Sequence, residues 1–154
     1  MLEQICDFIH NYFEVERHQG TFTISGGSIE LPFLIDGQRF RIIGSVLNDG
    51  IYTYYEDGDI FAADGETDVD LHDETFTGVI VSMAVPRSML ALAAEIKAWC
   101  DKNADALNSP YTSESFGGYS YTKATGAGSN GSGAGALTWQ DVFRKRLNAY
   151  RKLA

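Results

Sequence analysis

The spacing of apolar residues changes twice along this chain, and this change limits the folds that the chain can adopt. Near both ends, apolar residues recur every three or four positions, as on one face of an amphipathic helix. In the middle of the chain the period is two, as in a half-buried strand. The helical pattern covers Leu2–Phe13, Pro86 to about Asn103, and residues 139–153. The sequence therefore predicts an α+β protein.

We expect the three helical segments to form a small bundle, because each is too short to be stable alone. Residues 1–14 and 86–154 would make up this helical core, with a flexible arm and linker at 109–137. Residues 15–85 would form an inserted, antiparallel, β-rich subdomain. At the start of the last helix, Thr138 and Asp141 have the spacing of a capping box.

Short alternating segments, separated by turn sequences, fill the predicted β subdomain. Turns are predicted at Ser25–Gly27, Asp36–Gly37 and Asn48–Gly50. The expected strands are Thr21–Ile24, Ile29–Ile35, Gln38–Ile43, Ile51–Tyr55 and Thr75–Ala84. Short strands joined by tight turns favour a small antiparallel barrel or a curled sheet.

Acidic residues are concentrated in the middle of the chain. The formal net charge is −9, and ten of the 21 Asp and Glu residues lie between Ile42 and Pro86, where Lys and Arg are absent. This charge disfavours non-specific binding of nucleic acid through a basic surface. We expect residues 56–74 to be a solvated loop. Their carboxylates lack the spacing of a calcium-binding loop, so no metal site is expected.

The sequence contains no recognisable catalytic pattern. His10, His18 and His72 are scattered and lack the spacing of metal ligands. Cys6 and Cys100 fall within helical apolar stripes, where we expect free, buried thiols rather than a disulfide. No nucleophile elbow or phosphate-binding loop is present in the sequence. We therefore expect a protein that is not an enzyme and needs no cofactor.

Thr112–Lys123 lies between two of the expected helices and has the period of an extended strand. Gly117-Gly118 can supply the positive φ angles of a tight turn. The segment carries aromatic residues that need a surface to cover them. Either it is a hairpin lying on its own domain, or it is an arm that completes its pairing on a neighbouring subunit. The run Thr125–Gly135, rich in Gly and Ser, is expected to be a flexible linker.

The order of motifs near the C-terminus matches a known family. A helix is followed by Ser113-Glu114-Ser115-Phe116-Gly117-Gly118-Tyr119-Ser120-Tyr121-Thr122, and the chain closes with Leu147-Asn148-Ala149-Tyr150-Arg151. Over residues 86–154, this order resembles the head–tail connector proteins of tailed phages, also called adaptor or head-completion proteins. Two features depart from the usual pattern: Gly118 stands where an acidic residue is common, and a large β-rich segment precedes the helix.

The resemblance implies a structural virion protein that forms a ring between portal and tail and lets DNA pass without specific binding. Its partners would be further copies of itself, the portal protein, and the next tail or head-completion protein. It would be made in the bacterial cytoplasm and located in the virion, at the head–tail interface. The subunit interface is expected at Ser113, Glu114, Phe116, Tyr119, Tyr121 and Lys123, and the partner interface at Arg144, Lys145, Arg151 and Lys152.

The charge distribution suits such a ring. Five of the twelve Lys and Arg residues fall within residues 144–152, so an acidic middle and a basic end could meet head to tail between identical subunits. An acidic lumen would let DNA pass without adhesion. The alternative is a small, non-enzymatic binding module whose β subdomain holds a peptide or small ligand. Residues 1–15 lack signal-peptide features and no apolar run approaches membrane-spanning length, so no membrane partner is expected.

Overall fold

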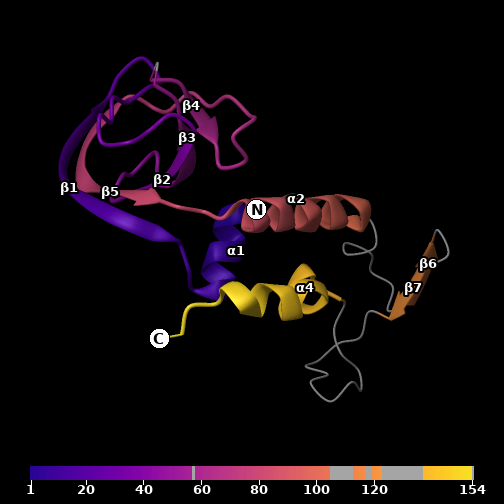
Figure 1. The fold of residues 1–154 in the computed structure, drawn as a ribbon. Coiled ribbons are helices and arrows are strands. Elements are labelled where there is room, and N and C mark those ends of the chain that lie inside the picture. The colour runs from indigo at the N-terminus through magenta and orange to yellow at the C-terminus, as the bar shows by residue number, and fades with distance from the viewer. Residues whose placement is uncertain (57, 105–112, 117–118, 123–136, 154) are drawn as a thin grey trace. The chain divides into compact units, whose positions relative to one another are not determined.

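The computed structural model describes residues 1–56, 58–104, 113–116, 119–122 and 137–153. These residues form three α-helices and a five-stranded antiparallel sheet, which confirms the predicted α+β class (Figure 1). The elements are α1 (Leu2–Ile9), β1 (Glu14–Ile24), β2 (Gln38–Ile43), β3 (Gly50–Tyr54), β4 (Ile60–Ala62), β5 (Glu74–Met83), α2 (Arg87–Lys102), β6 (Ser113–Phe116), β7 (Tyr119–Thr122), α4 (Trp139–Leu147) and the 3-10 turn η1 (Asn148–Tyr150).

The chain divides into two compact units, and the boundary between them lies within α2. One unit contains residues 1–93 and the C-terminal end from Lys152, and the other contains residues 94–151. The predicted packing of α1 with both later helices would join the two units and stays a prediction. The predicted division into a helical core and an inserted β subdomain also stays a prediction.

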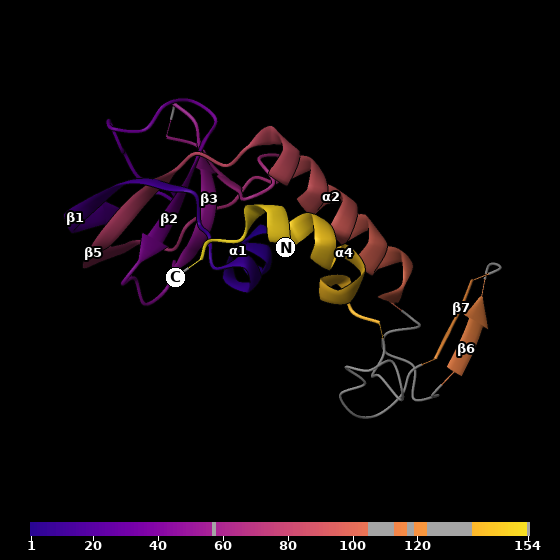
Figure 2. The same ribbon diagram turned by 60° about the horizontal axis from the view of Figure 1, so that its bottom comes forward.

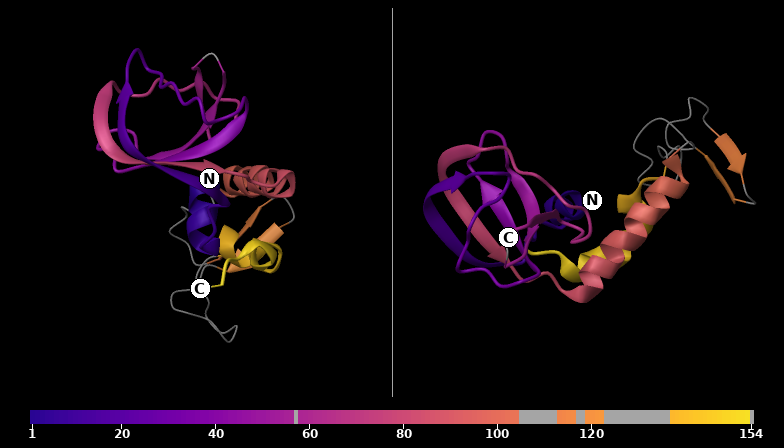
Figure 3. Two further views of the ribbon diagram at one scale, coloured as in Figure 1. Left: turned by 60° about the vertical axis from the view of Figure 1, so that its left-hand side comes forward. Right: turned by 90° about the horizontal axis from the view of Figure 1, so that it is seen from above.

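In the first unit the strands are arranged in the order β1-β5-β2-β3-β4, with every pairing antiparallel. The long strand β5 pairs with β1 over most of its length and with β2 on its other side. β1 and β5 lie side by side and curve together, as the views in Figures 2 and 3 show. Apolar side chains from the strands and the connecting segments form one core cluster. Its buried members are Ile24, Ile29, Leu31, Leu34, Phe40, Ile42, Tyr54, Ile60, Leu71, Phe76 and Ile80.

Gly78 lets β5 pass close to the chain that leaves β2. A Cβ atom at this position would overlap the carbonyl oxygen of Ile43 and would lie 3.3 Å from the Cα of Gly44. At Gly20, its cross-strand partner on β1, a Cβ would make only an ordinary contact, with the nearest atom 3.9 Å away. A glycine in a strand commonly marks such a tight bend or close backbone approach. Gly78 therefore permits the close approach of β5 to the chain that leaves β2.

Of the two forms predicted for the β segment, a small barrel or a curled sheet, the barrel is wrong. Among the described residues, β1 and β4 form the two edges of the sheet and do not pair with each other. Closure would require a continuous ladder of hydrogen bonds around the sheet. β4 has only three residues, which limits how far that edge can extend.

The N-terminal helix is shorter than predicted, because α1 ends at Ile9 and not at Phe13. His10 adopts the left-handed conformation that commonly ends helices, with φ 54°. The amide of Phe13 then donates to Oδ1 of Asn11 at 2.9 Å, a local bond that competes with helix continuation. The following turn is held to the sheet by the guanidinium of Arg41, which lies 3.8 Å from the centre of the Tyr12 ring.

Two strand predictions are wrong in the first half of the sheet. β1 begins at Glu14 and not at Thr21. Its first half is charged and exposed, so it lacks the apolar alternation from which the strand was predicted. Ile29–Ile35 is not a strand: Pro32 has no amide hydrogen for a ladder, and Leu34 N bonds Leu31 O in a turn. Ile29, Leu31 and Leu34 are nevertheless buried in the core.

The acidic segment is more ordered than predicted. Residues 60–62 form β4, which pairs with β3, and Ile60 and Leu71 are buried. Oδ1 of Asp64 accepts hydrogen bonds from the amides of Glu66 and Thr67, which turns the chain after β4. Part of the acidic content therefore serves turn geometry, and the expectation of a wholly solvated loop is wrong.

The predicted helix in the middle of the chain is confirmed by α2, which buries Met89, Leu92, Ala93 and Ile96. α4 begins at the predicted capping box but ends at Leu147, earlier than expected, and continues as η1. In the second unit, α2 and α4 pack together through Trp99 and Phe143, whose ring centres lie 6.3 Å apart in an edge-to-face arrangement.

Candidate assembly surfaces

β6 and β7 form an antiparallel hairpin of two four-residue strands, in the segment predicted as the arm. The pairs are Ser113 with Thr122, Glu114 with Tyr121, Ser115 with Ser120, and Phe116 with Tyr119. The predicted strand conformation is thus confirmed for these residues. The predicted turn Gly117-Gly118, the end residues Thr112 and Lys123, and the linker Thr125–Gly135 lie outside the described residues.

The register sorts the hairpin residues between its two faces. Residues directly opposite each other in an antiparallel pair lie on the same face, and successive residues alternate. One face therefore holds Glu114, Phe116, Tyr119 and Tyr121, and the other holds Ser113, Ser115, Ser120 and Thr122. Four of the six residues predicted for the subunit interface share one face, and Ser113 lies on the opposite one.

The predicted partner-interface residues differ in their local bonding. Nη2 of Arg144 lies 2.8 Å from Oδ1 of Asp141, so this guanidinium is held at the beginning of its own helix. Bonding to Arg144, and then to Thr138, lowers the pKa of the Asp141 carboxyl. Lys145 and Lys152 are exposed and Arg151 is half-buried. The backbone amide of Lys152 donates to the carbonyl of Ile9 at 3.0 Å, which ties the C-terminal end to the end of α1.

A further basic residue of α4 contributes to packing in the second unit. Nη1 of Arg146 lies 2.8 Å from Oε1 of Glu95 on α2. This hydrogen bond lowers the pKa of the Glu95 carboxyl and raises the pKa of the Arg146 guanidinium. Part of the basic cluster is therefore used inside the subunit, where it supports the contact between Trp99 and Phe143.

A polar network that the sequence did not indicate holds residues 44–49 against the start of β5. The carboxylate of Glu74 accepts hydrogen bonds from Ser45 Oγ at 2.5 Å, Val46 N at 3.0 Å and Asn48 Nδ2 at 2.7 Å. These bonds, the one from Ser45 first, lower the pKa of Glu74. The side-chain amide of Asn48 also forms two hydrogen bonds with the backbone of His72: Nδ2 donates to the His72 carbonyl at 2.9 Å, and Oδ1 accepts from the His72 amide at 2.8 Å.

This network presents two apolar side chains to solvent. Val46 is 90% exposed and Leu47 is 57% exposed, although the backbone beside them is fixed by Glu74 and Asn48. From the sequence, only a turn at Asn48–Gly50 was predicted. The signal for the network was the polar spacing of Ser45, Asn48 and Asp49, which is typical of side chains that bond the local backbone.

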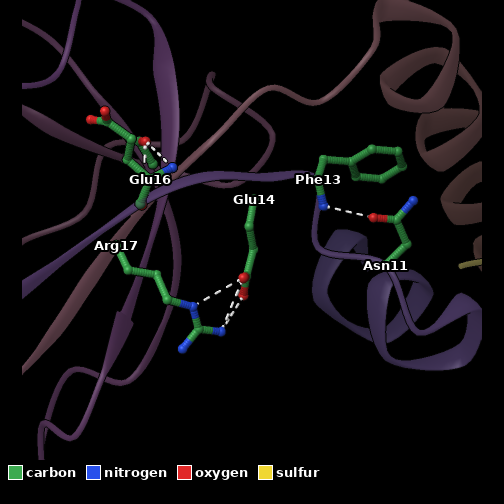
Figure 4. A network of polar contacts seen from close by, with 6 residues as sticks. Asn11, Phe13, Glu14, Glu16 and Arg17 are labelled. Carbon is green, nitrogen blue, oxygen red and sulfur yellow. Dashed lines mark hydrogen bonds and ion pairs between the residues drawn. The ribbon is translucent and has the colours of Figure 1, made fainter. Parts of the chain in front are cut away.

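The first half of β1 is protected against pairing with another strand. Glu14 and Arg17 form an ion pair of 2.8 Å (Figure 4). The register of β1 with β5 shifts between Glu14 and Glu16. The amide of Glu16 donates to Oγ of Ser82 at 3.2 Å at this irregularity. Charged side chains and bulges are the usual devices that blunt a sheet edge.

The opposite edge of the sheet is covered by its own chain. On β4, the amide of Ala62 donates to the carbonyl of Thr67 at 2.7 Å, and the carbonyl of Ile60 accepts from the amide of Val69 at 2.9 Å. An isolated bridge joins Phe61 to Asp68. Residues 67–69 therefore occupy the backbone groups that β4 would otherwise offer to another strand.

The histidines and cysteines do not come together. His10 and His72 are exposed, whereas His18 is half-buried and stacks on Phe33 with ring centres 3.7 Å apart. Both thiols are free; Cys6 is buried as predicted, and Cys100 is only half-buried. Burial raises the pKa of Cys6 to about 12, so its thiol is a packing group at neutral pH.

Among the residues that the structure describes, no cluster of three or more His, Cys, Asp or Glu side chains could hold a metal ion. None of the helices in the same part of the chain is long and apolar enough to cross a bilayer. Comparison of the chain with protein-family models, with curated proteins and with solved structures returns no match.

Proposed function

We propose that this protein is a ring-forming adaptor at the head–tail interface of a tailed phage. The observation that supports it best is the β6–β7 hairpin, whose sequence resembles that of phage connectors and which lies between α2 and α4 in the chain. Its register gathers Phe116, Tyr119 and Tyr121 on one face. Contiguous aromatic residues of this kind commonly mark a surface for contact with another protein.

In this proposal the protein acts by assembly and not by catalysis. Copies of the chain close into a ring beneath the portal protein, and the next tail or head-completion protein docks on that ring. DNA passes through the lumen without specific binding, because the acidic charge of the chain repels it. The helices form the bundle that the sequence predicts, and the exposed Lys145 and Lys152 contribute to contacts with a partner.

The alternative of a ligand-binding β subdomain has less support. The large side chains of the sheet core, among them Phe40, Tyr54 and Phe76, occupy the inner side of the sheet where a ligand would have to bind. This packing favours a structural role for the sheet.

Electron microscopy of the full chain mixed with the portal protein encoded in the same genome tests the proposal. We expect rings on the portal, and we expect Tyr119→Ser combined with Tyr121→Ser to reduce their number at least about tenfold, because two aromatic anchors are lost. Circular dichroism should show that this variant still folds, since the change lies in a hairpin outside the sheet core.

The matched control is Ser120→Ala combined with Thr122→Ala, which alters the opposite face of the same strand. This control should form rings as the wild type does. Absence of wild-type rings in the presence of the portal protein would contradict the proposed function. Normal rings from the tyrosine variant would contradict the role of the aromatic face.

A further inference from the structure

The edge strand β1 changes character along its length. Its first half carries the charged side chains of Glu14, Glu16 and Arg17, which Figure 4 shows, and its register with β5 shifts between Glu14 and Glu16. Its second half, Gln19–Ile24, contains no charge and no proline, and it pairs with β5 without a register shift. Charged side chains, prolines and bulges are the devices by which proteins normally protect an edge strand, and this half of β1 lacks all three.

The second half of β1 also has an unpaired side. Within the described residues, β5 is the only strand paired with β1, so the backbone groups that point away from β5 have no strand partner. The other edge of the sheet differs, because residues 67–69 bond the backbone of β4. The sheet therefore has one closed edge and one open edge in the part of the chain that is described.

Side chains along this open half suit the addition of a strand. Gln19, Thr21 and Thr23 are uncharged and exposed on the outer face. On the inner face, Phe22 is half-buried and packs on Phe76 with ring centres 5.7 Å apart. A strand added beside β1 would complete the cover of Phe22 and extend the core by one strand.

The β6–β7 hairpin also has unpaired strand edges among the described residues. It is a separate two-stranded sheet of four-residue strands, and each strand has one unpaired edge within the described residues. A hairpin of two strands is marginally stable in water and gains stability from a third strand or a covering surface. Its four-residue strands fit within the six residues of Gln19–Ile24.

We propose that the open half of β1, Gln19–Ile24, receives the β6–β7 hairpin of a second copy of this chain. The inference rests on the proposed function in requiring that copies of the chain meet in a ring. Each subunit offers one open edge and one hairpin, two different surfaces, so the contact is head to tail and can be repeated around a ring. Main-chain hydrogen bonds supply the pairing, and the aromatic face of the hairpin covers Phe22.

The register of the sheet provides a closely matched pair of variants. Thr21 lies opposite Thr77 and Thr23 opposite Thr75, with hydroxyl oxygens 3.0 and 3.1 Å apart. Thr21→Lys with Thr23→Lys, and Thr75→Lys with Thr77→Lys, remove the same two contacts and add the same charge to the same face. Only the first pair lies on the edge strand, where lysine blocks the approach of another strand.

We expect T21K/T23K to lower ring assembly at least about tenfold, which corresponds to about 1.4 kcal/mol. T75K/T77K should assemble to nearly the level of the wild type. In wild-type rings, amide hydrogen exchange should be slower than in the free chain at Gln19–Ile24 and at residues 113–122, and unchanged at Glu14–Arg17. A T21K/T23K variant that forms rings as the wild type does would overturn the inference.

The outcomes separate this inference from the proposed function. Wild-type rings without slowed exchange at Gln19–Ile24 overturn the inference and leave the function standing. Self-association that slows exchange at both segments, without rings on the portal, supports the inference and contradicts the function. Slowed exchange at Gln19–Ile24 alone would indicate pairing of β1 with β1 and overturn the hairpin as its partner. No rings and no slowing at any concentration overturn both.

Discussion

At the scale of single residues, the sheet depends on a close approach at Gly78. A Cβ there would overlap the Ile43 carbonyl oxygen, whereas a Cβ at Gly20 on the neighbouring strand would meet nothing closer than 3.9 Å. The two glycines are opposite each other in the register, so they share backbone environment but differ in available space.

We therefore predict that Gly78→Ala destabilises the protein by about 1–3 kcal/mol, as inserted methyl groups do in tightly packed sites. Gly20→Ala should be neutral or slightly stabilising, because alanine reduces the entropy of the unfolded chain. Chemical denaturation of both variants measures the difference. Equal stability of the two variants would show that the bend does not depend on Gly78.

The carboxylate of Glu74 provides a second prediction at this scale. Its pKa is lowered in the folded chain by the hydrogen bonds from Ser45, Val46 and Asn48. A lowered pKa means that the bonds stabilise the fold above the ordinary glutamate value of about 4.3 and lose this effect as pH falls through the lowered pKa.

Glu74→Gln should thus be less stable than the wild type at pH 7, and the difference should shrink as the pH falls below about 4. Thermal unfolding between pH 3 and 7 measures it. Glu30→Gln, which removes one carboxylate at an exposed position outside this network, is the control. A constant difference between E74Q and the wild type across this range would contradict the role of the charge.

At the scale of elements, α4 shows how a short helix is kept in place. It has nine residues, fewer than an isolated helix needs, and its capping box satisfies backbone groups at its start. Oγ1 of Thr138 accepts from the amide of Asp141 at 3.3 Å, and Asp141 in turn bonds Arg144 at 2.8 Å. The contact of Phe143 with Trp99 then holds the helix to α2.

We predict that Thr138→Ala destabilises α4 by about 1 kcal/mol, the usual effect of losing such a cap. Amide hydrogen exchange within α4 is the appropriate measurement, because it reports on this helix separately from the sheet. Thr138→Ser keeps the hydroxyl and should behave as the wild type. Unchanged exchange in T138A would mean that the contacts with α2 alone maintain the helix.

At the scale of the whole molecule, each of the two compact units carries one of the surfaces proposed for assembly. In the first unit, the closed edge at β4 and the charged half of β1 restrict strand addition to Gln19–Ile24. In the second unit, β6 and β7 pair only with each other among the described residues, so each strand has one unpaired edge. One subunit therefore carries two different surfaces of the kind that head-to-tail assembly requires.

Local patterns were enough to predict the elements whose stability is largely local. The apolar stripe of α2, the capping box of α4, the alternation of β2 and β5, and the pairing of the hairpin were all predictable from neighbouring residues. The α+β class followed from the same change of period. In each of these cases, the residues that determine the element lie within a few positions of one another.

Only the tertiary structure decided how the sheet is built and where it stays open. Glu16 pairs with Ser82 and Arg17 with Val81, partners more than sixty positions away, so a charged segment without alternation becomes a strand. Pro32 excludes Ile29–Ile35 from the ladder, yet the core still buries its apolar residues. The three-residue β4 exists because β3 pairs with it. Edges, closure and strand order depend on which distant segments meet, and no local period encodes that.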